Sequence, residues 1–165
     1  MTITEFRPRL DLFEQAPEMI KRLSGISQAI GASGEIDETL ALLVDVRASQ
    51  LNGCAFCLDM HVKQARIRGE RELRLHHVAG WRESPLFTPP ERAALAWTEA
   101  LTRLEADGVA DELYTAVREH FSERALVFLT LRVMMINGWN RLNVAFRTAP
   151  GSRDEDYGLD KAGLA

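Results

Sequence analysis

The two cysteines of the chain stand three residues apart in Cys54-Ala-Phe-Cys57, and His61 follows four residues after the second. At 3.6 residues per turn, these spacings place two thiols and an imidazole on one face of a helix. The unpaired N–H groups and the dipole at a helix start favour a thiolate near the first cysteine. A histidine one turn later can accept a thiol proton or, as imidazolium, stabilise a thiolate. The pattern therefore predicts a redox-active dithiol assisted by His61.

Two other interpretations of the pair stay open. Free cysteine is among the most buried residue types, so the pair would also suit a purely structural role. A zinc site would use both thiolates and His61, but it needs a fourth ligand, which would have to come from the remaining histidines, His76, His77 or His120. Spacing also leaves open which thiol attacks a substrate, because Cys54 has the better position in the helix dipole whereas Cys57 has the histidine.

The composition is typical of one ordinary globular domain. Apolar residues make up 46% of the 165 residues, and 20 Lys+Arg against 24 Asp+Glu give a net charge of -4, without the basic surplus that nucleic acid or anionic lipid would favour. The most apolar region, residues 125–146, is interrupted by arginines, so no segment reaches the roughly 18 to 20 residues of a spanning helix. Residues 1–10 lack an apolar signal-peptide core. We therefore expect a cytoplasmic protein with no membrane and no nucleic-acid partner.

Leu, Ala, Glu and Arg recur at three- and four-residue spacings, which predicts an all-α fold of about six to eight helices. Asn52-Gly53 is a natural helix stop, and Thr88-Pro89-Pro90-Glu91 has the residues of a capping box. Helices are expected at about residues 17–30, 37–51, 54–68, 89–104, 111–120 and 123–147, with a short segment at 70–81. Residues 1–150 would form the helical domain. Residues 151–165, with three glycines and six charges, would form a flexible tail or a strap on a neighbouring subunit.

A weak internal similarity raises the hypothesis that a helix-joint-helix unit is duplicated. Residues 47–53 (Arg-Ala-Ser-Gln-Leu-Asn-Gly) and 132–138 (Arg-Val-Met-Met-Ile-Asn-Gly) share an arginine and Asn-Gly in register. If the similarity is real, the last apolar segment should bend or break at Asn137-Gly138. Asn137, Asn140 and Arg141 are polar groups inside that segment, and they are expected to tie helix ends or subunits together, because buried polar groups need partners.

The segment Arg47-Ala-Ser-Gln-Leu-Asn-Gly-Cys54-Ala-Phe-Cys57-Leu-Asp-Met-His61 resembles the core signature of AhpD-like alkylhydroperoxidases in the carboxymuconolactone decarboxylase superfamily. Trp81-Arg-Glu-Ser and Asn137-Gly-Trp-Asn-Arg141-Leu resemble further segments, so the likeness covers roughly residues 15–150. The resemblance implies an all-helical homo-oligomer, a trimer or hexamer, in which the dithiol reduces a hydroperoxide and an external dithiol or protein reductant restores it. Decarboxylase members lack the cysteine pair, so their activity is not implied. We expect no metal and no other cofactor.

The resemblance also implies roles for single positions. The redox cysteines of the family fall on Cys54 and Cys57, and its proton-relay histidine falls on His61. Its relay glutamate falls on Leu42, which cannot move a proton. Two acids of the same helix would replace it, Glu38 or, nearer the thiols along the chain, Asp45.

We therefore expect a thiol-dependent peroxidase or disulfide reductase, an oxidoreductase with a peroxide as acceptor. The alternative is a peroxide-responsive redox sensor or a partner-binding helical protein without turnover.

Overall fold

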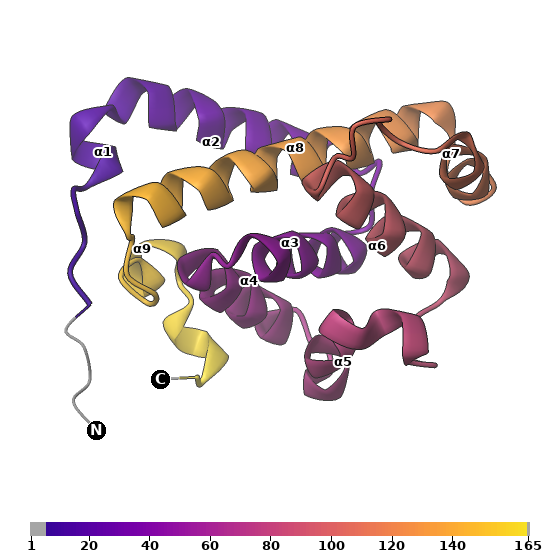
Figure 1. Cartoon of the computed structure of the whole chain (residues 1–165). Helices are drawn as coiled ribbons and strands as arrows, with labels where there is room; N and C mark the ends of the chain where they lie inside the picture. Colours follow the sequence, from indigo (N-terminus) through magenta and orange to yellow (C-terminus); the bar gives the residue numbers. More distant parts are fainter. Residues whose placement is uncertain (1–5, 165) are drawn as a thin grey trace.

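The computed structural model describes residues 6–164, and the helices in this part of the chain confirm the all-α prediction (Figure 1). α-Helices and two 3-10 helices follow in the order α1 (Leu12–Gln15), α2 (Pro17–Ala32), α3 (Glu38–Asn52), α4 (Ala55–Ile67), α5 (Glu72–His77), η1 (Val78–Glu83), α6 (Pro89–Thr102), α7 (Asp111–Arg118), α8 (Glu123–Phe146), α9 (Asp154–Tyr157) and η2 (Asp160–Ala162). The helix number exceeds the expected six to eight because α1 and α9 have four residues each, too few for a helical period. Part of the irregular start expected before Pro17 lies in residues 1–5, outside the described residues.

Helix α3 lies at the centre of the fold and packs against α4, α6 and α8, while α2 lies along α8 (Figure 1). Seven consecutive residues of α3, 40–46, are buried. Leu43 and Val46 join the core beneath η1 and α6, whereas Leu40 and Val44 join a second core with α6, α7 and α8. Burial on several sides explains why the sequence of α3 shows no clean apolar stripe.

The junction between α3 and α4 sets the position of the two thiols. Gly53 ends α3 in the left-handed conformation, at φ 65°, which glycine adopts without the steric cost of a side chain. The next residue, Cys54, is already the N-cap of α4, and its Sγ accepts a hydrogen bond from the Cys57 N–H at 3.3 Å. Asn52-Gly53 is thus the helix stop that the sequence predicts, and it brings the α4 start directly onto the end of α3.

Helix α8 runs without interruption from Glu123 to Phe146, so the bend expected at Asn137-Gly138 is absent. The Asn137 Nδ2 donates to the Val133 carbonyl, and its Oδ1 accepts from Asn52 of α3, so the asparagine is satisfied without leaving the helix. Gly138 lies exposed on the outer side of α8. The prediction of a second joint was wrong. The bend that the duplication hypothesis required is not found in α8.

Residues 151–164 lie against α4 of their own chain (Figure 1). The Lys63 ammonium, 7% exposed, contacts the Asp154 carboxylate at 2.6 Å and the Asp59 carboxylate at 2.8 Å. Leu159 in this segment is buried. The pair of carboxylates on one lysine therefore fastens the C-terminal segment to α4. The division into a domain over 1–150 and a flexible or subunit-strapping tail stays a prediction.

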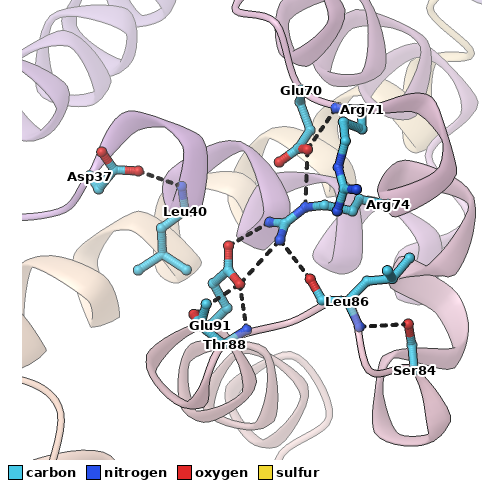
Figure 2. A network of polar contacts seen from close by, with 9 residues as sticks. All are labelled: Asp37, Leu40, Glu70, Arg71, Arg74, Ser84, Leu86, Thr88 and Glu91. Atoms are coloured by element: carbon cyan, nitrogen blue, oxygen red, sulfur yellow. Dashed lines mark hydrogen bonds and ion pairs between the residues drawn. The ribbon is translucent and has the colours of Figure 1, made fainter.

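A polar network around Arg74 fastens α5 to the start of α6 (Figure 2). The Arg74 guanidinium contacts Glu91 at 2.5 Å, Glu70 at 3.0 Å and the Leu86 carbonyl at 2.6 Å. Glu91 also accepts from the Thr88 N–H at 2.7 Å, which is the capping box predicted from the sequence. None of these residues lines the candidate site cavity described below, so the network supports the fold rather than the chemistry.

Candidate functional site

A disulfide joins Cys54 and Cys57 at the first turn of α4. Both residues are buried, at 2% and 0% exposure, but they differ in what they face. Cys57 lines a cavity of about 350 Å³, whereas Cys54 is not among the residues that line it. A small molecule in this cavity would therefore lie beside Cys57 rather than Cys54. We refer to the space as the site cavity.

His61 lies one turn after Cys57 and lines the same cavity. Its Nδ1 lies 2.8 Å from the Gln64 Oε1 and 3.5 Å from the Asp45 Oδ2. Because both oxygens are acceptors, this arrangement places the ring proton on Nδ1. The Nε2 is buried and has no hydrogen-bond partner in the described part of the chain. His61 thus presents an open, basic nitrogen in the interior of the protein.

Burial lowers the pKa of His61 below the ordinary histidine value, because the charged form loses hydration. The Asp45 carboxylate acts in the opposite direction but does not reverse the shift, and the Arg132 guanidinium adds to the lowering. The imidazole is therefore neutral at neutral pH. A neutral imidazole with a free Nε2 is the form that accepts a proton from a thiol.

Asp45 and Arg132 form a buried ion pair between α3 and α8. Asp45 is 1% exposed, and its Oδ1 accepts from the Arg132 Nε at 2.9 Å while its Oδ2 accepts from Nη2 of the same guanidinium. The side chain of Arg132 keeps 20% of its surface exposed. The pair carries no net charge, and it anchors the carboxylate that faces His61.

The structure separates the two acids considered as a replacement for the family glutamate. Asp45 lines the site cavity beside His61. Glu38 instead forms an ion pair with Arg68 at 2.7 Å, and the two side chains are 60% and 58% exposed. Leu42, onto which the resemblance places the family glutamate, is buried in the apolar core. Cys57, His61 and Asp45 are therefore brought together, whereas Glu38 is not.

The walls of the site cavity are mainly apolar. Side chains from α1, α2, α3, α4, α8 and α9 contribute to the lining, and the large apolar ones are Phe13, Phe56, Met60, Met135, Ile136 and Trp139. Tyr157 of α9 also lines the cavity, so the C-terminal segment contributes to the site. Such a space suits a small organic molecule.

Sequence reasoning missed several polar residues of the site. Gln64 had a usable signal, since it stands three residues after His61 on the same helix face. Arg132 and Asn143 gave none, because both come from α8 and reach the site only through helix packing. Asn137 and Asn140 behave as expected: both accept from the Asn52 Nδ2, at 2.9 and 2.8 Å, and so tie the end of α3 to α8.

The other histidines lie away from the site cavity. The His76 ring faces Glu72 on its own helix, and the Nδ1 of His77 lies 3.0 Å from the Ser84 hydroxyl. Neither they nor His120 line the cavity. Within residues 6–164, no three His, Cys, Asp or Glu side chains gather in a metal-binding arrangement. In the same part of the chain, no helix is both long enough and apolar enough to cross a membrane.

Comparison with known proteins identifies the family. The model of the carboxymuconolactone decarboxylase family matches residues 17–100. The uncharacterised protein YdfG of Bacillus subtilis is 39% identical over 145 residues, which are 88% of this chain and 98% of YdfG.

Solved structures agree. One is a protein of unknown function from Agrobacterium tumefaciens, described provisionally as an antioxidant defence protein AhpD. It is 37% identical to this chain with a TM-score of 0.84, and the match covers 87% of this chain and 98% of the Agrobacterium chain. An uncharacterised peroxidase-related protein with an AhpD core from Ralstonia eutropha shares the fold at 19% identity, with a TM-score of 0.76 over 86% of this chain and 75% of its own. With the helical fold and the disulfide of α4, these matches show that the chain belongs to the carboxymuconolactone decarboxylase family and is AhpD-like.

Proposed function

We propose that the protein is a thiol-dependent peroxidase that reduces organic hydroperoxides through the Cys54–Cys57 dithiol. The observation that carries the proposal is the shared cavity: the sulfur-bearing Cys57 and the neutral His61, with its unpartnered Nε2, line one apolar space. A sulfur beside a base in a mainly apolar pocket is an arrangement that suits thiol chemistry on a small substrate.

In the proposed cycle, the reduced enzyme begins with two thiols. The His61 Nε2 takes the proton of the Cys57 thiol, and the thiolate attacks the terminal oxygen of the hydroperoxide. The O–O bond breaks, the alkoxide receives the proton, and an alcohol leaves while Cys57 becomes a sulfenic acid. The Cys54 thiol then attacks that sulfur, forming the disulfide and releasing water.

A second dithiol must return the enzyme to its starting state. One of its thiolates attacks the Cys54–Cys57 disulfide, its second thiol completes the exchange, and the external dithiol leaves oxidised. The proposal therefore requires an external dithiol or a protein reductant, and it suits the cytoplasm, where such reductants keep thiols reduced. The expected trimer or hexamer stays a prediction.

Asp45 and Gln64 have positioning roles in this proposal. Both present acceptors to the His61 Nδ1, at 3.5 and 2.8 Å, and so keep the proton on that nitrogen and the lone pair on Nε2. Asp45 would therefore take the place of the family glutamate, although it reaches the histidine from another turn of α3. Glu38 has no part in the proposed cycle, because it pairs with Arg68 instead.

The test is peroxidase turnover with cumene hydroperoxide and dithiothreitol in the wild type, Cys54→Ser and Cys57→Ser. We expect turnover in the wild type and none in Cys57→Ser. In the absence of dithiothreitol, which would itself reduce a sulfenic acid, Cys54→Ser should consume one equivalent of peroxide as Cys57 forms a sulfenic acid and then stop. Turnover in Cys57→Ser, or no consumption of peroxide by Cys54→Ser, would refute the cycle. If the wild-type protein reacted once and was not reduced by any dithiol tested, the redox sensor would replace the enzyme as the function.

A further inference from the structure

We propose that Asn143 is a catalytic residue that stabilises the thiolate of Cys57 and not that of Cys54. The inference rests on the proposed function, because it assigns the group that makes Cys57 the attacking sulfur. It concerns a residue of α8, the helix that faces the start of α4 across the site cavity.

The contact joins an amide donor to the reacting sulfur. The Asn143 Nδ2 lies 3.7 Å from the Cys57 Sγ, within the range of an N–H hydrogen bond to sulfur. The same nitrogen donates to the Trp139 carbonyl at 2.9 Å. A carbonyl oxygen can only accept, so this bond fixes which end of the amide faces the sulfur. One N–H thus serves the helix and the other is directed at Cys57.

The rest of the amide shows that it belongs to the cavity. Asn143 is 5% exposed and lines the site cavity, yet none of the described residues donates a hydrogen bond to its buried Oδ1. An amide that served packing alone would have both ends satisfied, since an unpaired buried carbonyl costs stability. The unpaired Oδ1 of Asn143 therefore lowers the stability of the fold locally, while the N–H of the same amide lies within hydrogen-bond distance of the Cys57 sulfur.

A donor in this position favours the charged form of the thiol. Hydrogen bonds to an ionised acceptor are stronger than those to a neutral one, so the Asn143 N–H stabilises a Cys57 thiolate more than a thiol. The Cys54 Sγ accepts from the backbone N–H of Cys57 instead, and among residues 6–164 no side chain donates to it. Asn143 therefore lowers the pKa of one thiol of the pair selectively.

The experiment measures that pKa without peroxide, in proteins that keep one thiol. In the Cys54→Ser background, the rate of iodoacetamide alkylation against pH gives the pKa of Cys57, with and without Asn143→Leu. Loss of a hydrogen bond to a charged group should raise the pKa of Cys57 by about one to two pH units. Because less thiolate is then present, alkylation near neutral pH should slow by about tenfold or more. The titratable groups around the cavity, His61, Asp45, Arg132 and Tyr157, are the same in both proteins.

The matched control places Asn143→Leu in the Cys57→Ser background. There, the pKa of Cys54 should be unchanged. An unchanged pKa of Cys57, or an equal rise for both thiols, would overturn the assignment. Asn143→Asp, which keeps the size of the side chain, covers the case in which leucine prevents folding: its carboxylate should also raise the pKa of Cys57, and an unchanged value would again overturn the assignment.

The alkylation result is independent of the proposed peroxidase cycle. If the pKa of Cys57 rises as expected but the wild type shows no peroxidase turnover, the proposed function fails while the role of Asn143 stands. If the wild type turns over peroxide but the pKa of Cys57 does not change, the role of Asn143 fails while the proposed function stands.

Discussion

Replacing Asp45 with asparagine tests how the site is held together. Asn is close to Asp in size and can still accept one hydrogen bond, so the change removes mainly the charge. In the wild type, the carboxylate is 1% exposed and accepts two hydrogen bonds from Arg132. The variant leaves the guanidinium without its buried counter-ion. We expect Asp45→Asn to lower both the stability of the fold and the pKa of His61.

The magnitude follows from the charge separation and the burial. Opposite charges about 4 Å apart attract by roughly 4 kcal/mol at the effective dielectric constant of about 20 that suits partly buried pairs. Arg132, with 20% of its side chain exposed, regains part of its hydration when the carboxylate is removed. We therefore expect a loss of about 2 to 3 kcal/mol in the free energy of unfolding. With an m-value of about 2 kcal/mol/M in urea, the unfolding midpoint should fall by roughly 1 to 1.5 M.

The assay is urea unfolding of Asp45→Asn with Glu38→Gln as the matched control. Glu38 is the other acid of α3 suggested by the sequence, but its pair with Arg68 is exposed and should contribute less than about 1 kcal/mol. An NMR titration of the His61 ring supplies the second readout, because the Asp45 carboxylate raises the pKa of His61 and its removal should lower it. Equal midpoints for the two variants, or an unmoved His61 titration, would refute the reasoning.

Two further predictions concern His61 and the C-terminal segment. His61→Gln should lower kcat/KM for hydroperoxide by about a hundredfold or more. Because the pKa of His61 is lowered in the folded protein, the unfolded chain binds more protons at pH values below about 6.5, so stability should fall as the pH drops through that window. Urea unfolding of His61→Gln should show a shallower fall, and an equally steep one would contradict the assignment. Lys63→Met should leave Asp59 and Asp154 facing each other without the ammonium and so release residues 151–164 from α4. Chymotrypsin should then cleave at Tyr157 about tenfold faster, whereas the exposed change Lys161→Met should have no effect; unaltered cleavage in Lys63→Met would show that other contacts hold the segment.

Several features of the protein were predictable because they depend on neighbours in the sequence. The Asn52-Gly53 stop, the Thr88–Glu91 capping box and the succession of helices follow from local backbone preferences, and the structure reproduces them. The placement of Cys57 and His61 on one side of α4 follows from the four-residue spacing alone. The same reasoning failed at Asn137-Gly138, because an Asn-Gly pair can also continue a helix when other side chains satisfy the asparagine.

The rest of the candidate site depends on how the helices pack. Asp45 and Glu38 were both plausible partners for His61 along the chain. The two acids lie nearly on one face of α3 but about 10 Å apart along its axis, so only the packing of α3 against α4 decides which acid reaches the imidazole and which stays exposed. Arg132 and Asn143 lie 87 and 86 residues from the side chains they contact. By itself, the sequence determined the dithiol, its histidine and the helix that carries them, because these are separated by less than two helical turns. Tertiary structure decided which acid, which arginine and which amide surround them, and that Cys57 rather than Cys54 lines the cavity, because contacts across helices depend on packing that no local pattern encodes.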